Sequence, residues 1–410
     1  MRILVQKFGG SSVADRDRML RVREKVRTGL SQGYKMLVVL SARSGDTNKL
    51  LALADEWSKT PDPAECDSLV STGEQVSIAL FTMLLKDEGI KARSLLGFQI
   101  PIKTDDVFMK ARIRSIDADV IKKMFDTYDV LVVAGFQGIN DEGRITTLGR
   151  GGSDTSAVAL AAAIKADACE IYTDVDGVYT TDPNVCPKAQ KMPQVTYDEM
   201  LEMASMGAKV LEIRSVEFAK KYGVVVHVRS TFTDTPGTFV SEEESNMEHV
   251  LVSGIAYDKD QARVTLRSLP DVPGVASSIF SLLSNGNVAV DMIVQNPSRN
   301  GVTDMTFTVS RKDLQNTLAI MEDVSKKLFD GIEILHDINI AKISAIGVGM
   351  RNHSGVAATA FAALHRENIN ILLISTSEIK ISCLIDEKYL ELAVRTLHTA
   401  FGLDKPTEME

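Results

Sequence analysis

Short apolar runs alternate with longer helix-periodic stretches through about the first 240 residues, and this alternation constrains the fold more than any other feature. Several runs are almost continuously apolar, as in strands that helices cover on both faces. The pattern predicts an α/β fold built on a doubly wound, mostly parallel sheet. The expected strands are Ile3–Phe8, 36–41, 92–99, 130–136, 170–173 and 224–228, and the expected helices are 15–30, 66–88, 110–126 and 153–165.

A change of texture follows at residues 230–244. The run Ser-Thr-Phe-Thr-Asp-Thr-Pro-Gly-Thr is rich in turn-forming residues and leads into three consecutive glutamates at 242–244. Such a composition is typical of a linker, so we expect a domain boundary here.

An internal repeat occupies the remainder of the chain. The segment that begins Asp271-Val-Pro-Gly-Val-Ala is matched by one that begins Asn352-His-Ser-Gly-Val-Ala. Each copy predicts strand, helix, strand, strand and helix, and copy one adds a last strand near 332–338. The expected elements are 262–267, 273–285, 288–295, 303–309 and 311–328 in copy one, and 341–348, 354–367, 369–375, 378–384 and 387–401 in copy two.

Copy two ends in a polar tail without a closing strand, while the strand-like run 249–256 is left over before copy one begins. Because an unpaired sheet edge is a liability, we expect the leftover strand to complete the second unit. The predicted domains are therefore 1–240, 262–340, and 249–261 together with 341–404, with copy one nested inside copy two.

Charge and cysteine content narrow the functional classes. The 410 residues carry a net charge of −9 with a pI near 5.4, which argues against a general nucleic-acid or anionic-membrane binder. The polar N-terminus and the lack of a long apolar run predict neither a signal peptide nor a membrane span. The four scattered cysteines predict buried thiols in a reducing, cytoplasmic setting, and the six histidines form no metal-binding or triad pattern.

Two glycine-rich turns carry candidate chemistry. Lys7-Phe-Gly9-Gly10-Ser11-Ser12 follows the first strand, and such a turn lets backbone N–H groups approach a phosphate, aided by the dipole of a following helix. An ordinary strand-to-helix turn is the alternative. In the second turn, Ser153 or Asp154 is placed to cap a helix, whereas Arg150 stands between glycines, where it could clamp a carboxylate.

Two further motifs are weaker alone. Asp174, Asp176 and Asp182 lie within nine residues after an apolar strand, which is compatible with either Mg²⁺–nucleotide handling or a simple turn. Ser71-Thr-Gly-Glu74 opens a helix, so Glu74 could act in a site or simply favour the helix dipole.

Together, the order and spacing of these four motifs resemble the aspartate kinases, which have the amino-acid kinase fold. The two repeats resemble the paired ACT domains of those enzymes, ferredoxin-like βαββαβ units. The resemblance implies transfer of the ATP γ-phosphoryl group to the side-chain carboxylate of L-aspartate, the entry step to lysine, threonine, methionine and diaminopimelate.

The resemblance also assigns roles to matching positions. It implies Lys7, Asp154 and Lys209 as catalytic residues. The aspartate pocket would contain Ser41, Thr47, Glu74, Phe136, Arg150 and Ser153, with Arg150 on the α-carboxylate and Glu74 on the ammonium. The nucleotide side would contain Lys7, Gly9, Gly10, Ser11, Thr173, Asp174, Tyr179, Asp182 and Lys209, with Mg²⁺ held mainly through the ATP phosphates rather than by protein ligands.

Regulation and assembly are implied in the same way. Lysine, threonine or both would bind at ACT interfaces lined by Asp271, Gly274, Ala276, Gln295, Asn370 and Ile371. The ACT domains would join chains into a homo-oligomer or an α/β hetero-oligomer. Asn184 stands where many relatives carry arginine, which affects the expected contacts with ATP.

Two alternatives stay open from the residues. Another small-acid kinase, for glutamate or acetylglutamate, would share the fold, and a catalytically silent amino-acid sensor could use the same scaffold. Intact Lys7, Arg150 and Asp154 disfavour the sensor, because a sensor has no need of them.

Overall fold

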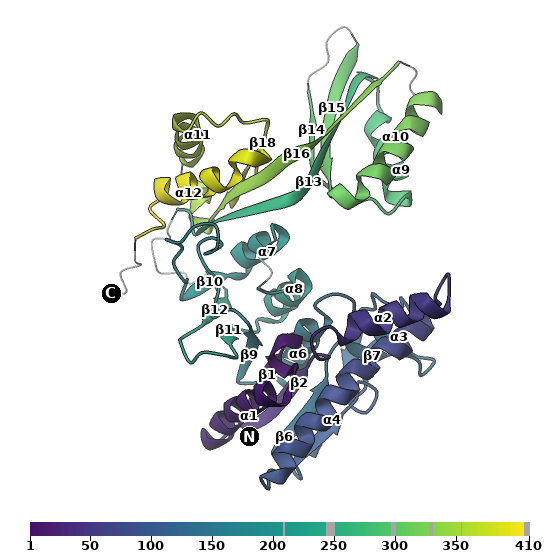
Figure 1. Cartoon of the computed structure of the whole chain (residues 1–410), viewed down its shortest axis with the longest axis vertical. Helices are drawn as coiled ribbons and strands as arrows, with labels where there is room; N and C mark the ends of the chain where they lie inside the picture. The colour runs from purple at the N-terminus through teal and green to yellow at the C-terminus, as the bar shows by residue number, and fades with distance from the viewer. Residues whose placement is uncertain (208–209, 243–250, 297–300, 328–330, 354, 406–410) are drawn as a thin grey trace. The chain divides into compact units, whose positions relative to one another are not determined.

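The computed structural model describes residues 1–207, 210–242, 251–296, 301–327, 331–353 and 355–405. By its internal contacts the chain divides into two compact units. The first contains residues 1–179 and 191–247, and the second contains residues 180–190 and 248–410. Figure 1 shows the elements of both units in chain order.

The first unit is built on an eight-stranded sheet with helices packed on it, as the alternating pattern predicts. Strand β1 lies centrally between β2 and β9, and all neighbours from β11 to β3 run parallel. The sheet order is β10 (Gln194–Thr196), β12 (Thr238–Ser241), β11 (Val226–Ser230), β9 (Ala168–Thr173), β1 (Ile3–Phe8), β2 (Lys35–Leu40), β6 (Val130–Ala134) and β3 (Ala92–Leu95).

Helices α1 (Arg16–Ser31) and α4 (Thr72–Asp87) bury their apolar residues on one face of this sheet. The core there includes Phe8, Val22, Phe81 and Val132, all fully buried. The other helices of the unit are α2 (Asp46–Trp57), α3 (Pro63–Val70), α5 (Ala118–Met124), α6 (Gly152–Ile164), α7 (Tyr197–Ser205) and α8 (Ile213–Tyr222).

Three predictions about elements of the first unit are wrong. The helix expected at 110–126 begins instead as strand β5 (Ile113–Ile116), part of a small sheet with β4 (Ile102–Thr104), β7 (Gln137–Ile139) and β8 (Ile145–Thr147). The single helix expected at 66–88 is two helices separated at Ser71. The expected linker contains β12, which pairs with both β10 and β11.

The run Pro63–Asp87, which includes both α3 and α4, is long and apolar enough to pass a length-and-composition test for a membrane span. Half of its most apolar window is buried inside the unit. Phe81 and Leu85 are fully buried in the sheet core, and Glu74 is buried on the same helix. We therefore interpret the run as core helices of a folded unit.

The second unit contains one six-stranded antiparallel sheet that runs through both repeats. Its order is β14 (Val290–Gln295), β15 (Val302–Val309), β13 (Gly254–Pro270), β16 (Glu333–Ile346), β18 (Lys380–Asp386) and β17 (Leu373–Thr376). The helices are α9 (Val275–Asn285), α10 (Leu314–Lys327), α11 (Val356–Arg366) and α12 (Leu390–Ala400).

The prediction of separate strands for the two repeats is wrong at two places. The part of the run expected at 249–256 that begins at Gly254 is joined to the run expected at 262–267 in β13, whereas residues 251–253 are not in a strand and residues 249 and 250 lie outside the described residues. The runs expected at 332–338 and 341–348 are joined in β16. A backbone irregularity near Asp258–Arg263 changes the pairing register along β13, so one strand serves both repeats.

Each half of the long sheet nevertheless has a core of its own. Ala262, Leu266, Ile279 and Phe307 belong to one cluster of buried residues. The other cluster contains Val252 and Ile255 from the leftover segment, with residues of α11 and α12. The leftover segment thus packs with copy two, and Ile255 pairs with Ala345 of β16.

Candidate active site

The carboxyl ends of the parallel strands meet at one edge of the first unit's sheet, which is where ligands bind in open α/β sheets. Lys7 is the penultimate residue of β1, Ser41 follows β2, Phe136 follows β6 and Thr173 ends β9. The topology therefore brings together residues that are far apart in the sequence.

A buried ion pair lies at the centre of this edge. The Nζ atom of Lys7 is 2.5 Å from Oδ1 of Asp154, and both side chains are 11% exposed. Lys7 comes from β1 and Asp154 from the first turn of α6. Removing either partner would leave a buried charge without compensation, which is costly.

The first glycine turn packs tightly between its neighbours. A Cβ atom on Gly10 would lie 2.8 Å from the carbonyl oxygen of Ala42, so only glycine fits. Gly9 has Nζ of Lys7 3.5 Å from the position a Cβ would take. The lysine amine therefore lies beside backbone that carries no side chain, a surrounding suited to an anion.

The helix expected at 15–30 is α1, but a short segment separates it from this turn. Residues Gly10–Val13 form a short 3₁₀ helix, and α1 begins only at Arg16. Asp15 already caps α1 by accepting a hydrogen bond from the Arg18 N–H at 2.9 Å. The dipole of α1 is therefore not available to a phosphate at Gly9 and Gly10.

Ser11 precedes Ser12, whose hydroxyl is 2.7 Å from that of Thr231 in the loop after β11. The N–H of Thr231 donates to the carbonyl of Thr173 at 3.0 Å. These bonds join the ends of β1, β9 and β11, and sequence reasoning did not single out Thr231. A lone threonine in a turn-rich segment offers no signal that would distinguish it.

Glu74 is the buried acid of the site. It is 3% exposed in the first turn of α4, and one carboxylate oxygen accepts the N–H of Ala42 at 2.9 Å. The other oxygen is buried without a hydrogen-bond partner among the described residues. Burial raises the pKa of Glu74 to about 7, although the hydrogen bond from Ala42 opposes the rise.

Ser41 and Thr47 come from the segment between β2 and α2 and from α2 itself. Ser41 donates its N–H to the carbonyl of Phe8 at 3.2 Å, and Thr47 is in the first turn of α2. Both are partly exposed.

The second glycine turn presents Arg150. Arg150 is exposed and has neither a hydrogen bond nor an ion pair within the described part of the chain. Gly151 has φ +63°, and a Cβ there would lie 1.7 Å from Cγ of Glu212, so a side chain is excluded. The arginine is therefore held on a backbone that only glycine can form.

The prediction that Ser153 or Asp154 caps α6 is wrong. Gly151 is the N-cap residue and no side chain caps the helix. Ser153 instead packs against Gly135, where a Cβ would be 2.8 Å from the serine Oγ. Phe136 has φ +69°, and its ring lies beside Gly152.

The nucleotide-side residues divide between the two units. Thr173 bonds to Asp174 at 2.9 Å, and the hydroxyl of Tyr179 donates to Asp176 at 2.8 Å in the first unit. Hydrogen bonding to Asp176 and burial raise the pKa of Tyr179 to about 12, with burial the larger cause. Asp182 belongs to the second unit. Lys209 lies outside the described residues.

Within the second unit, Asp182 is engaged. It accepts the hydroxyl of Tyr257 at 2.8 Å, and it accepts both the N–H and the side-chain amide of Asn184 at 2.9 and 3.0 Å. Asn184 therefore serves the local turn in place of an extended arginine. Nothing in the sequence signals the partnership with Tyr257.

The predicted effector residues are split between the two repeats. Asp271 follows β13 and donates its N–H to Gly301 at 3.0 Å, while Gly274 begins α9 with φ +99°. The remaining four are Ala276 in α9, Gln295 at the end of β14, and Asn370 and Ile371 before β17.

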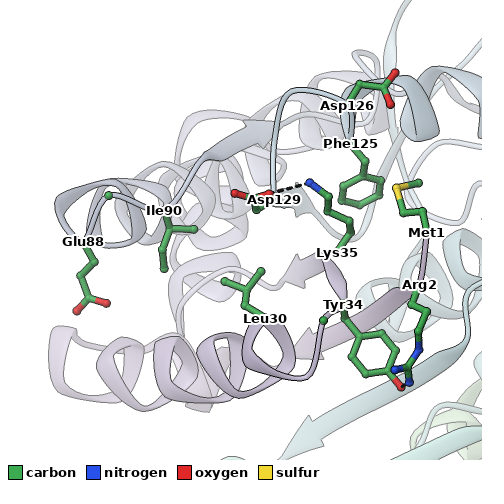
Figure 2. Close-up of a pocket in the computed structure, with 12 residues that line it drawn as sticks. Met1, Arg2, Leu30, Tyr34, Lys35, Glu88, Ile90, Phe125, Asp126 and Asp129 are labelled. Carbon is green, nitrogen blue, oxygen red and sulfur yellow. Dashed lines mark hydrogen bonds and ion pairs between the residues drawn. The ribbon is translucent and has the colours of Figure 1, made fainter.

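A hollow of the first unit lies at the opposite edge of the sheet. It measures about 750 Å³ and lies at the amino ends of β1 and β2, beside Arg2, Tyr34 and Lys35. Figure 2 shows Lys35 paired with Asp129 in this hollow, at 2.7 Å. It shares no residue with the site described above.

A parallel α/β sheet with a lysine–aspartate pair and a close-packed glycine turn at its carboxyl edge suits phosphate chemistry, and a family match assigns the chain to the phosphotransferases of the amino-acid kinase class. The profile of the Amino acid kinase family matches residues 2–230, and that of the ACT domain matches residues 267–324 and 343–401. The chain is 54% identical over 407 residues to the aspartate kinase of Stutzerimonas stutzeri, covering 99% of this chain and 98% of that protein.

Two crystal structures of E. coli aspartokinase III are also similar. The one in complex with aspartate and ADP has a TM-score of 0.78 at 29% identity, covering 97% of this chain and 99% of that one. The one in complex with lysine and aspartate has a TM-score of 0.77 at 28% identity, covering 98% and 99%. The chain belongs to the aspartate kinase family.

Proposed function

We propose that the enzyme transfers the γ-phosphoryl group of ATP to the side-chain carboxylate of L-aspartate, forming 4-phospho-L-aspartate and ADP. The observation that carries this proposal is the buried Lys7–Asp154 pair beside the close-packed Gly9–Gly10 turn. It places a cation next to backbone that a phosphate can approach.

The acceptor carboxylate is already ionised at neutral pH, so the reaction needs no strong general base. Catalysis then depends on positioning and on neutralising the charge of the transferring group. Lys7 supplies positive charge between donor and acceptor, and Asp154 keeps its amine oriented. Lys209, Ser11, Thr173 and Tyr179 are proposed to contact the nucleotide.

The aspartate pocket is proposed to use opposite charges at its two ends. Arg150, exposed and unpaired within the described residues, suits the α-carboxylate of the substrate. Glu74, buried with one free oxygen, suits its ammonium. Ser41, Thr47, Phe136 and Ser153 complete the pocket.

The described residues contain no group of three His, Cys, Asp or Glu side chains suited to hold a metal. Mg²⁺ is proposed to be bound mainly through the ATP phosphate oxygens, where it would neutralise phosphate charge. Asp174 and Asp182 are proposed on the nucleotide side.

Control by end products is proposed for the second unit. Lysine, threonine or both would bind at the six effector residues named above, Asp271, Gly274, Ala276, Gln295, Asn370 and Ile371. The product of the reaction would feed the synthesis of lysine, threonine, methionine and diaminopimelate. The proposed domains are residues 1–240 for catalysis, 262–340 for the first ACT unit, and 249–261 with 341–404 for the second.

Assembly through the ACT units, as a homo-oligomer or an α/β hetero-oligomer, is part of the same proposal. The edge strands β14 and β17 carry the exposed residues Ile293 and Ile374, which a neighbouring chain could cover. All four cysteines are buried and unpaired, which supports a reducing, cytoplasmic setting.

The test is ADP release from Mg²⁺–ATP with L-aspartate, compared with glutamate and acetylglutamate. Turnover with aspartate alone supports the proposal. Turnover only with another acid would make the chain a different small-acid kinase, and no turnover with any acid would make it a sensor. Lysine and threonine, added singly and together, test the regulatory part.

A further inference from the structure

The loop that carries Arg150 lies along a second segment of the first unit. The N–H of Ala111 donates to the carbonyl of Thr147 at 2.9 Å, and a Cβ on Gly149 would lie 3.1 Å from the carbonyl oxygen of Met109. Residues 147–149, at the start of the second glycine turn, therefore lie beside residues 109–111, which belong to none of the sequence motifs.

A buried carboxylate holds this pair from one side. Asp67, in α3, has no exposed surface. It accepts the N–H of Met109 at 3.0 Å, and it accepts both the N–H and the hydroxyl of Thr147, at 2.8 and 2.5 Å. Burial raises the pKa of Asp67, while these three groups stabilise its ionised form.

The guanidinium of Arg214 bonds to the same two backbone segments, 109–111 and 147–149. Arg214, in α8, donates to the carbonyl of Leu148 at 2.6 Å and to that of Ala111 at 2.7 Å. It makes no salt bridge within the described residues, so its two strong hydrogen bonds are both to loop backbone. Burial lowers the pKa of Arg214.

The backbone held in this way is strained. Met109 has φ +65°, which is unfavourable for a residue with a side chain. Such a conformation persists only where the surroundings enforce it, and here Asp67 takes the Met109 N–H. Among the described residues, the buried carboxylate of Asp67 bonds only to the loops that carry Met109 and Thr147. It therefore stabilises the geometry of these loops rather than the hydrophobic core.

We infer that Asp67 and Arg214 are positioning residues that clamp the 147–152 loop and so fix Arg150 for the α-carboxylate of the substrate. The inference rests on the proposed function, because it takes Arg150 as a substrate contact. Displacing a binding group by a fraction of an ångström weakens substrate binding strongly, whereas a site elsewhere on the sheet is unaffected.

The first test is Asp67→Asn. The amide turns one acceptor into a donor that faces backbone N–H groups, so we expect the KM for aspartate to rise about ten- to hundredfold. The KM for ATP should stay within about twofold, because Lys7 and its turn do not contact Asp67. Hydrogen exchange at Met109 and Thr147 should accelerate, while that of β1 stays slow.

Asp105→Asn is the matched control. Asp105 accepts the N–H groups of Val107 and Arg112 at 3.3 and 3.0 Å, in the same loop but without reaching Thr147. Because Asp105 also acts electrostatically on Arg214, this variant should change the KM for aspartate far less than Asp67→Asn does. If it raises that KM as much as Asp67→Asn does, the clamp is refuted.

Two milder changes keep the test decisive if Asp67→Asn folds poorly. Thr147→Val removes only the hydroxyl, and Arg214→Lys removes one of two carbonyl bonds, so each should raise the KM for aspartate several-fold with circular dichroism unchanged. Lys220→Met, on the same helix as Arg214, is the control, since its amine bonds to the partly exposed Asp198 at 2.6 Å.

The outcomes separate the two proposals. If the variants raise the KM for aspartate and the KM for ATP equally, or raise neither, the clamp is overturned. The proposed function is upheld in that case as long as the wild-type enzyme phosphorylates aspartate. A wild-type enzyme that does not phosphorylate aspartate overturns the proposed function and, with it, the role of the clamp.

Discussion

Replacing Glu74 by glutamine should change how stability depends on pH. The native pKa of Glu74 is raised by burial to about 7, from an ordinary value of 4.5. The native state therefore keeps a proton that the unfolded chain releases between these two values, so the free energy of unfolding falls as pH rises through this window. A gap of about 2.5 pH units, at about 1.36 kcal/mol each, gives about 3 kcal/mol.

Glutamine is neutral throughout and can still accept the Ala42 N–H. We therefore expect Glu74→Gln and wild type to be similar near about pH 4.5 and the variant to be more stable by about 3 kcal/mol above about pH 7. Urea unfolding followed by circular dichroism across this range measures the difference. Glu56→Gln, which changes an exposed carboxylate on α2, controls for losing one carboxyl group.

The pH dependence of the KM for aspartate tests the ionisation of Glu74 independently of stability. If ionised Glu74 holds the substrate ammonium, the KM of the wild type for aspartate should fall as pH rises through about 7, and Glu74→Gln should have a high KM without this dependence. Stability curves of variant and wild type that run parallel from about pH 5 to about pH 8 would refute the reasoning.

Three further predictions concern other residues. Lys7→Ala should lower kcat by several orders of magnitude and, because Asp154 is left buried and unpaired, destabilise the first unit by about 3 kcal/mol; near-normal kcat would contradict the role. Asp271→Ala should weaken inhibition by lysine or threonine and spare basal activity, so unchanged inhibition curves would mean that the effector site lies elsewhere. Tyr257→Phe removes the hydrogen bond to Asp182 and should lower stability by about 1 kcal/mol, measured by thermal unfolding; an unchanged midpoint would argue against the contact.

The sequence predicted the central strands well because each is a short, almost continuously apolar run, which is stable only when both of its faces are buried. Ile3–Phe8 is β1, as expected, and the helix expected at 153–165 differs from α6 by one residue at each end. The expected helix at 110–126 failed at its first half. Ile113–Ile116 becomes a strand because it pairs with β4, a partner distant in the sequence.

The repeat was visible as a pattern, but its joined strands were not. Nothing local in residues 257–261 indicates whether a chain turns or continues, because a bulge and a turn use similar residues. Pairing of β13 with β16 along most of its length decides the question.

The active site likewise combines features that the sequence shows with features that only long-range contacts decide. The motifs drew attention to Lys7, Glu74, Arg150 and Asp154, and the resemblance to the aspartate kinases gave these residues their predicted roles. The sequence could not show that Lys7 and Asp154 form a buried pair, since 147 residues of chain separate them.

The sequence therefore shows which reactive side chains are present, whereas tertiary packing decides the burial, partners and pKa of each of these side chains. Asp67 carries no motif, and its role follows only from a fully buried position between two loops. Glu74 is an ordinary helix-start acid until burial raises its pKa. Side-chain identity is a local property, but burial, pairing and pKa depend on which distant segments surround it.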